Sequence, residues 1–124
     1  MKTIIAGSRT IELDEVTTFL DELKQLGVVI TEVVSGTAKG VDSHGELWAK
    51  ENGIPVKRFP ANWDEFGKSA GCIRNQEMLD YAEQVIVIWD GTSRGTKNMI
   101  DIAKRKKMMI YLLETDIKSQ LDLF

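Results

Sequence analysis

Short apolar runs alternate with longer stretches of mixed polarity along this chain. Gln84 to Trp89 is an almost continuous apolar run, which is typical of a strand buried on both faces. Residues 28–35 are rich in β-branched side chains and predict another strand. In all, the runs predict five strands, at residues 3–6, 28–35, 54–59, 84–89 and 107–113.

The stretches between these runs carry apolar residues at helical spacing. Within residues 14–26, Val16 and Leu20 are among the positions that fall on one face of a helix. Asp14 is placed to cap the N-terminus of this helix, and Gly27 is placed to end it. Further helices are predicted over residues 40–52, 73–82 and 96–106, whereas residues 61–71 are expected to be irregular.

This alternation favours an α/β fold, with a mostly parallel sheet of about five strands and helices on both of its faces. Residues 1–124 contain no linker, repeat or low-complexity tract, so we expect a single domain. Right-handed crossovers place every strand-to-helix turn at the same edge of such a sheet. Ligands bind at that edge, where the strand order reverses. We therefore look for the functional site in these turns.

Three of the expected turns are rich in glycine and small polar residues. They are Gly7-Ser8-Arg9, Ser35-Gly36-Thr37-Ala38-Lys39-Gly40 and Gly91-Thr92-Ser93-Arg94-Gly95-Thr96. Turns of this kind leave backbone N–H groups unpaired at the start of a helix, where the helix dipole adds partial positive charge. Because phosphate is favoured there, three such turns at one sheet edge predict a site for a nucleotide-like ligand.

Two common phosphate-binding motifs do not fit the chain. Residues 36–40 lack the G-x-G-x-x-G spacing of dinucleotide-binding folds. Gly67-Lys68-Ser69 resembles the end of a P-loop, but Asn62 stands where that motif begins with glycine, and no strand leads into it. An ordinary ATPase or GTPase and a standard NAD dehydrogenase are therefore disfavoured.

The composition restricts the class of protein further. The net charge of −3 disfavours broad binding of duplex nucleic acid but allows a local basic pocket. The single cysteine, Cys72, permits no internal disulfide, and we expect it to be a small buried residue. No apolar run approaches the length of a membrane span. We expect a soluble, cytoplasmic protein without membrane contact.

Other charged groups have plainer interpretations. His44 is the only histidine and has no cysteine near it in the sequence, so a zinc site is disfavoured and no metal site is expected. A surface or packing role on the second helix is favoured for His44, with general-base chemistry as the alternative. The basic run from Lys104 to Lys107 falls at a predicted helix C-terminus, where positive charge complements the helix dipole.

Motifs spread over nearly the whole chain resemble the SLOG superfamily, which groups Smf/DprA proteins with LOG-type proteins. The resemblance is greatest to its small single-domain branch of YspA/YpsA-related proteins. It implies a Rossmann-like, three-layer fold over residues 1–124 and a pocket for a nucleotide or a nucleotide derivative. The matching segments are Gly7-Ser8-Arg9, Ser35 to Asp42, Phe59 to Trp63, Gly67 to Gly71, Arg74-Asn75, Met78 and Gly91 to Thr96.

The last of these segments departs from the LOG-type pattern. LOG-type phosphoribohydrolases carry Pro-Gly-Gly-x-Gly-Thr-x-x-Glu, in which the glutamate serves catalysis. Here Gly95-Thr96 is kept, but the Pro-Gly-Gly start is lost and Met99 stands at the position of the glutamate. Because a thioether is neither an acid nor a base, the resemblance implies a phosphate site without implying that mechanism.

The turns and motifs together give a set of candidate ligand-binding residues. Asp42 is expected to bond a ribose hydroxyl or to shape its own turn, and Asn75 to read a base or to pin a loop. Trp63 could stack on a base or cover the sheet edge. The candidate phosphate-binding cations are Arg9, Lys68, Arg74 and Arg94. The other candidates are Gly7, Ser8, Ser35, Gly36, Thr37, Ala38, Lys39, Gly40, Gly71, Gly91, Thr92, Ser93, Gly95 and Thr96.

These residues favour a binding module that senses or sequesters a nucleotide or an ADP-ribose-like ligand. An enzyme that cleaves an N-glycosidic bond is the first alternative, and it would need a carboxylate such as Asp42, Glu46 or Glu77 near the anomeric carbon. Single-stranded DNA binding, the role of the DprA relatives, is the second. The negative charge and the lack of a series of aromatic residues disfavour nucleic acid as a partner.

The end of the chain suggests one further contact. The tail from Asp116 places Ile117, Leu121 and Phe124 at helical spacing. This pattern fits a short docked helix or a contact with a partner, and a homo-oligomer is one such arrangement.

Overall fold

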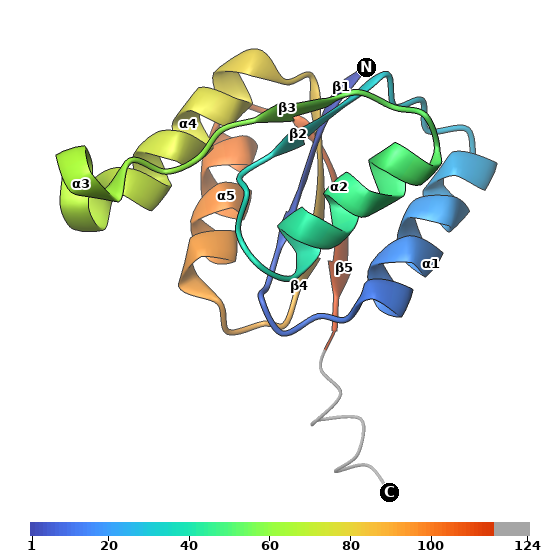
Figure 1. Cartoon of the computed structure of the whole chain (residues 1–124), viewed down its shortest axis with the longest axis horizontal. Helices are drawn as coiled ribbons and strands as arrows, with labels where there is room; N and C mark the ends of the chain where they lie inside the picture. The colour runs from blue at the N-terminus through green and yellow to red at the C-terminus, as the bar shows by residue number, and fades with distance from the viewer. Residues whose placement is uncertain (116–124) are drawn as a thin grey trace, which may run out of the picture.

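The structure of the protein, a computed structural model, describes residues 1–115 and alternates strands with helices (Figure 1). The strands are β1 (Lys2–Gly7), β2 (Glu32–Ser35), β3 (Val56–Arg58), β4 (Gln84–Trp89) and β5 (Met109–Glu114). The helices are α1 (Leu13–Gln25), α2 (Val41–Glu51), α3 (Trp63–Phe66), α4 (Ala70–Tyr81) and α5 (Arg94–Arg105), and a 3₁₀ turn, η1 (Gly67–Ser69), precedes α4. None of these helices is long and apolar enough to cross a bilayer.

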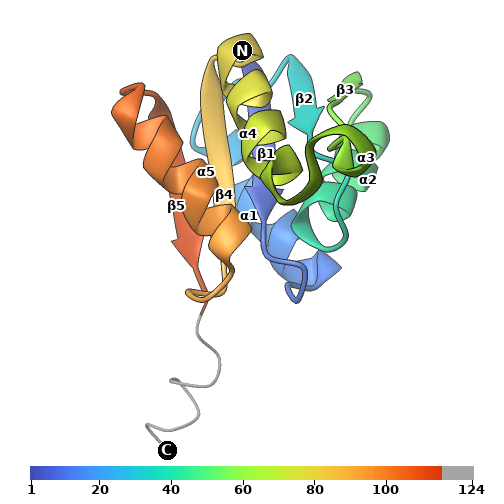
Figure 2. The ribbon, with the colours of Figure 1, turned by 90° about the vertical axis from the view of Figure 1, so that its left-hand side faces the viewer.

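The strands form one parallel sheet in the order β3-β2-β1-β4-β5. Helices α1 and α2 cover one face of the sheet, and α4 and α5 cover the other (Figure 2). The chain moves outward from β1 to β3 and then returns to pair β4 with β1, so the strand order reverses between these two strands. The predicted three-layer α/β fold is confirmed. The reversal is also where this fold class binds its ligands.

Alternate residues of the central strands supply the two apolar cores. Along β1, Ile5 packs under α1 and α2, whereas Ile4 and Ala6 pack under α4 and α5. Trp48 of α2 is 2% exposed, and its indole N–H donates to Asp21 of α1 at 2.9 Å. The period-2 alternation of a strand thus fixes which helix each β1 side chain meets. β1 ends at the edge of the sheet where the strand-to-helix turns meet.

Two strands are shorter than predicted because strand length depends on available partners. β2 begins at Glu32, which pairs with Lys2 at the start of β1, so residues 28–31 have no strand beside them. Val28 and Ile30 instead pack on the core from an irregular segment. β3 pairs only with the last three residues of β2, and the N–H of Ile54 bonds to the end of α2.

The starts of several helices also differ from the prediction, and α5 begins at Arg94 rather than at residue 96. The N-cap of α1 is Glu12 rather than Asp14, because the Glu12 carbonyl already accepts the N–H of Val16. Residues 61–71 are not wholly irregular: Asn62 accepts the N–H of Glu65 at 3.1 Å and starts α3, and α4 begins at residue 70. The helical spacing expected for the tail falls on residues 116–124, outside the described part of the chain.

Candidate functional site

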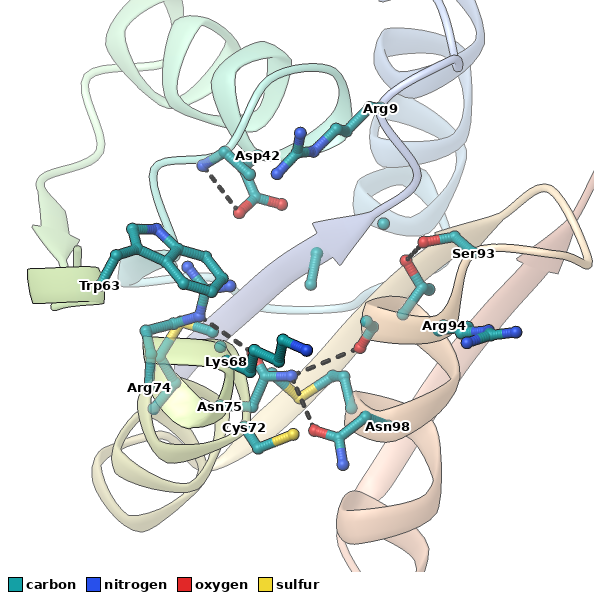
Figure 3. Close-up of a pocket in the computed structure, with 18 residues that line it drawn as sticks. Arg9, Asp42, Trp63, Lys68, Cys72, Arg74, Asn75, Ser93, Arg94 and Asn98 are labelled. Carbon is teal, nitrogen blue, oxygen red and sulfur yellow. Dashed lines mark hydrogen bonds between the residues drawn. The ribbon is translucent and has the colours of Figure 1, made fainter. Parts of the chain in front are cut away.

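A cavity of about 350 Å³ opens at the edge of the sheet where β1 and β4 end. The turn after β1, the start of α2, the α3–α4 segment and the start of α5 all contribute to its wall. Figure 3 shows Arg9 and Asp42 along one side of the cavity, with Trp63, Lys68 and Arg74 on another. The sheet topology therefore brings together residues from most of the chain length.

The wall of this cavity is strongly basic for an acidic protein. Of the residues in the described part of the chain, four cations line it and Asp42 is the one acidic residue that does. Within residues 1–115 the ion pairs are Arg58–Glu46, Lys97–Asp101 and Lys106–Asp80, so no lining cation is neutralised by one. Anions are the ligands that such a wall attracts. The lining cations are Arg9, Lys68, Arg74 and Arg94.

Arg74 joins α4 to the turn between β2 and α2. Its guanidinium donates to the carbonyl of Gly36 and, at 3.0 Å, to the side-chain oxygen of Asn75. Burial lowers the pKa of Arg74, the Asp42 carboxylate opposes this, and the nearby Arg9 lowers the pKa further. Two guanidinium groups therefore face a shared space in which an anion would relieve their repulsion.

Asp42 is 5% exposed and accepts the N–H of Ala38 at 3.2 Å. Burial raises the pKa of this carboxyl group to about 6, and that effect outweighs the N–H groups of Ala38 and Gly7 and the charge of Arg74, which favour ionisation. Asp42 therefore presents to the cavity a carboxyl group whose pKa lies well above that of an ordinary aspartate.

The turn between β2 and α2 is held in an unusual conformation. Ser35 is buried, donates to Glu46 at 2.6 Å and accepts the N–H of Thr37 at 3.1 Å. Thr37 has a φ of 65°, which is strained for a β-branched residue. Gly40 has a φ of 78°, and a Cβ there would lie 2.5 Å from the Cα of Arg9. The turn is thus rigid, and it packs directly on the turn after β1.

Asp90 organises the turn between β4 and α5. Its carboxylate accepts the N–H groups of Thr92 and Ser93 at 2.9 and 2.8 Å. Burial works against ionisation here, but these two N–H bonds and the hydroxyls of Ser8 and Thr92 together outweigh it and lower the pKa of Asp90 to about 2. In an α-helix the first N–H groups have no intrahelical partner, and the first residues of α5 line the cavity. The hydroxyls of Ser93 and Thr96 lie 3.1 Å apart beside them (Figure 3).

Asn75 links the two helices that flank the cavity. Its amide nitrogen donates to the Gly95 carbonyl at 3.3 Å and to the Asn98 side chain at 3.0 Å. Its oxygen accepts from Arg74. Because both ends of the amide are engaged, Asn75 connects α4 to the start of α5.

The sequence-predicted residues separate into three groups. The hydroxyl of Ser8 accepts the N–H of Asp90, which explains why that side chain faces the protein rather than the cavity. Lining the cavity are Gly7, Arg9, Ala38, Asp42, Trp63, Lys68, Gly71, Arg74, Asn75, Ser93, Arg94, Gly95 and Thr96. Lining an adjoining hollow are Gly36, Thr37 and Lys39. Outside both linings are Ser8, Ser35, Gly40, Gly91 and Thr92.

Several lining residues were not predicted. Cys72 was expected to be buried but is exposed, because its side of α4 faces the cavity rather than the sheet. The helical spacing of α4 indicates this placement, since Cys72 and Asn75 are three residues apart on that helix. The residues missed are Ala6, Cys72, Met78, Asn98 and Met99.

Other candidates for chemistry lie away from the cavity. Glu46 is engaged by Ser35 and by Arg58, whose Nε lies 2.7 Å from it, and Glu77 is exposed on α4. Neither lines the cavity, and His44 does not line it either. Within residues 1–115 no three His, Cys, Asp or Glu side chains gather in a way that could hold a metal ion.

Sequence comparison gives a family and two similar proteins. The model of the YAcAr family, described as the YspA, cpYpsA-related SLOG family, matches residues 1–66. The Gene 61 protein of Mycobacterium phage D29 is 32% identical over 115 residues, which cover 84% of this chain and 89% of that protein. The uncharacterized SPbeta prophage-derived protein YoqJ of Bacillus subtilis (strain 168) is 30% identical over 61 residues, which cover 48% of this chain and 36% of that protein.

Structure comparison finds the same fold in DNA processing protein A (DprA) from Streptococcus pneumoniae. The TM-score is 0.72 at 18% sequence identity, and the match covers 94% of this chain and 50% of the DprA chain. At that identity the likeness concerns the fold alone. The chain thus spans half of the DprA structure and about a third of YoqJ.

Proposed function

The chain belongs to the YspA, cpYpsA-related SLOG family, and from this premise we propose that it binds a nucleotide-derived small molecule at the edge of its sheet. One observation carries the proposal. A cavity at the reversal of strand order gathers four cations, none in an ion pair within residues 1–115, in a chain whose net charge is −3. Phosphate groups fit such a wall better than any neutral ligand.

Each part of the cavity has a role in this proposal. The start of α5 and Lys68 hold phosphate, since a helix N-terminus and an ammonium group both favour it. Arg94 lies at the rim, where its side chain points away from Arg74 (Figure 3), and it would attract the ligand at longer range. Asp42 accepts from a ribose hydroxyl, and the half-exposed indole of Trp63 stacks on the base.

The first test is a search for a copurified ligand. Small molecules released from the denatured protein are identified by mass spectrometry, and a panel of nucleoside mono- and diphosphates and ADP-ribose is then screened by thermal shift. A ligand at one hundred times its Kd stabilises the folded state by about 2.7 kcal/mol, which raises the Tm by roughly 10 °C. Lys68→Ala is expected to raise the Kd about tenfold.

The matched control is Lys104→Ala, which removes the same charge from the exposed far end of α5. It is expected to leave the Kd within twofold of that of the parent protein. Equal weakening by both variants would mean that only the net charge matters and would contradict the proposed site. If nothing on the panel binds and a labelled single-stranded oligonucleotide shows a salt-sensitive mobility shift, the DNA-binding alternative replaces the proposal.

A second candidate function rests on Asp42. Among residues 1–115 it is the one carboxyl group that lines the cavity, and its pKa is raised to about 6. A carboxylate of this kind could stabilise the cation-like state formed when an N-glycosidic bond breaks. In that case Asp42→Asn should lower the rate of base release at least a hundredfold while the Kd changes less than threefold. Base release is measured by chromatography, and turnover by the Asn variant at the parent rate would exclude this role.

A further inference from the structure

A second hollow adjoins the cavity on the side of the β2–α2 turn. Its volume is about 270 Å³, and it is lined by residues 36–39 together with Pro60 and Ala61. Arg9, Ala38, Trp63 and Arg74 line both spaces. Because four residues are common to the two walls, the cavity and this side pocket form two compartments of one cleft.

Each compartment has a cation of its own beside the shared pair. Arg9 and Arg74 border both spaces. Lys68 and Arg94 line only the cavity, and Lys39 lines only the side pocket. Within residues 1–115 no acidic residue lines the side pocket, and Asp42 lies on the cavity side. The positive charge therefore extends through both compartments and is not confined to one phosphate site.

The backbone that forms the side pocket is fixed before any ligand arrives. Glu46 bonds Ser35 at 2.6 Å and Arg58 at 2.7 Å, and Ser35 in turn accepts the N–H of Thr37. Arg74 also holds the Gly36 carbonyl from the opposite side. A preformed site loses little conformational entropy when its ligand binds.

We propose that the ligand of this cleft is a nucleotide carrying two phosphoryl groups that are not attached to each other, one in each compartment. This inference rests on the proposed nucleotide-binding function and adds the substrate class. The shared guanidinium groups of Arg9 and Arg74 lie between the two anionic groups, and the nucleoside passes Trp63. A nucleoside diphosphate has the same number of phosphoryl groups but places both at one end.

The test compares three probes by isothermal titration: a nucleoside 5′-monophosphate, its 5′-diphosphate and its 3′,5′-bisphosphate, all with the base that gives the largest thermal shift. The bisphosphate is expected to bind at least tenfold more tightly than the diphosphate. Lys39→Ala should raise the Kd of the bisphosphate about tenfold and leave the Kd values of the other two probes within twofold. Lys68→Ala should weaken all three probes.

Lys50→Ala serves as the control, because Lys50 is exposed on α2 and lies in neither lining. It should leave every Kd unchanged within twofold. If the diphosphate binds as tightly as the bisphosphate, or if Lys39→Ala weakens the three probes equally or not at all, the two-compartment inference fails while nucleotide binding stands. If no probe binds, the proposed function and the inference fail together.

Discussion

Replacing Gly7 with alanine is expected to lower the free energy of unfolding by about 4 kcal/mol, since overpacking of a closed site adds to the loss of backbone hydrogen bonding. Gly7 ends β1 beside Ile88 of β4, where the strand order reverses. A Cβ at this position would lie 2.0 Å from the carbonyl oxygen of Ile88 and 2.7 Å from a methyl group of Val41. The same carbonyl accepts the N–H of Ser8 at 3.1 Å.

Neither the Ile88 carbonyl nor the Val41 side chain can move away from the new methyl group without a large energetic cost. The Ile88 carbonyl belongs to the sheet backbone, and Val41 is fully buried at the start of α2. The extra methyl group must therefore push β1 away from β4 or push α2 off the sheet. Either movement would also open the cavity that these elements border.

Urea denaturation and thermal melting measure this effect, with Gly95→Ala as the matched control. Apart from its chain neighbours and the backbone of its own helix, no atom of residues 1–115 lies within 4 Å of a Cβ built at Gly95, which is in the first turn of α5. Alanine there should keep or raise the stability by up to about 1 kcal/mol. The Gly7 variant should melt roughly 15 °C lower or fail to accumulate as folded protein. A melting temperature within 2 °C of the parent value would refute the close packing of this turn.

The second large effect concerns Asp42→Asn. The pKa of Asp42 is about 6 in the folded protein and 3.8 in the reference state. A shift of roughly two pKa units corresponds to about 3 kcal/mol. We expect the amide to raise the free energy of unfolding at pH 7.5 by up to that amount, because it removes a charge buried at 5% exposure.

The sign follows from proton binding. Because the folded-state pKa is raised, the folded protein holds more protons than the unfolded chain between pH 3.8 and about 6. This group therefore makes the parent protein less stable as the pH rises through that range, and its full penalty is present above it. Below pH 3.8 the carboxyl group is neutral in both states, so the parent and the Asn variant should have nearly equal stability.

The free energy of unfolding of the parent protein is compared with that of Asp42→Asn at each pH. The difference isolates the contribution of Asp42 from those of the other carboxyl groups. This comparison is needed because the pKa of Asp90 is lowered to about 2, so Asp90 makes the folded state more stable as the pH rises. Asp101→Asn is the control, since the Asp101 side chain is 42% exposed and pairs with Lys97 on the same helix. It should change the stability by less than about 0.5 kcal/mol at any pH. A pH-independent difference between the parent protein and Asp42→Asn would contradict the buried carboxylate.

Local sequence patterns could predict most elements of the fold but not their limits. The apolar run from Gln84 to Trp89 forms the strand expected of it, because a central strand needs apolar residues on both faces. Residues 28–35 look equally strand-like, yet only the last four are paired. The length of β2 depends on where β1 begins, and no local pattern contains that information.

The candidate site could be predicted in outline, because strand-to-helix turns must meet at one edge of a parallel sheet. Two features of the site could be known only from the tertiary structure. The N–H groups of Thr92 and Ser93 are used by Asp90, so part of a glycine turn that looked free for phosphate is internally satisfied. Cys72 lies at the cavity because of the rotation of α4 about its axis, which packing sets.

By itself, the sequence determined the alternation of strands and helices, the positions of the glycine turns and the cations available to an anionic ligand. Tertiary structure alone decided that Lys39 and Lys68 border different compartments and that Arg9 and Arg74 border both. It also decided that Asp42 titrates near pH 6. The reason is physical: periodicity and turn chemistry act over a few residues, whereas desolvation and charge interaction depend on distances between groups far apart in the chain.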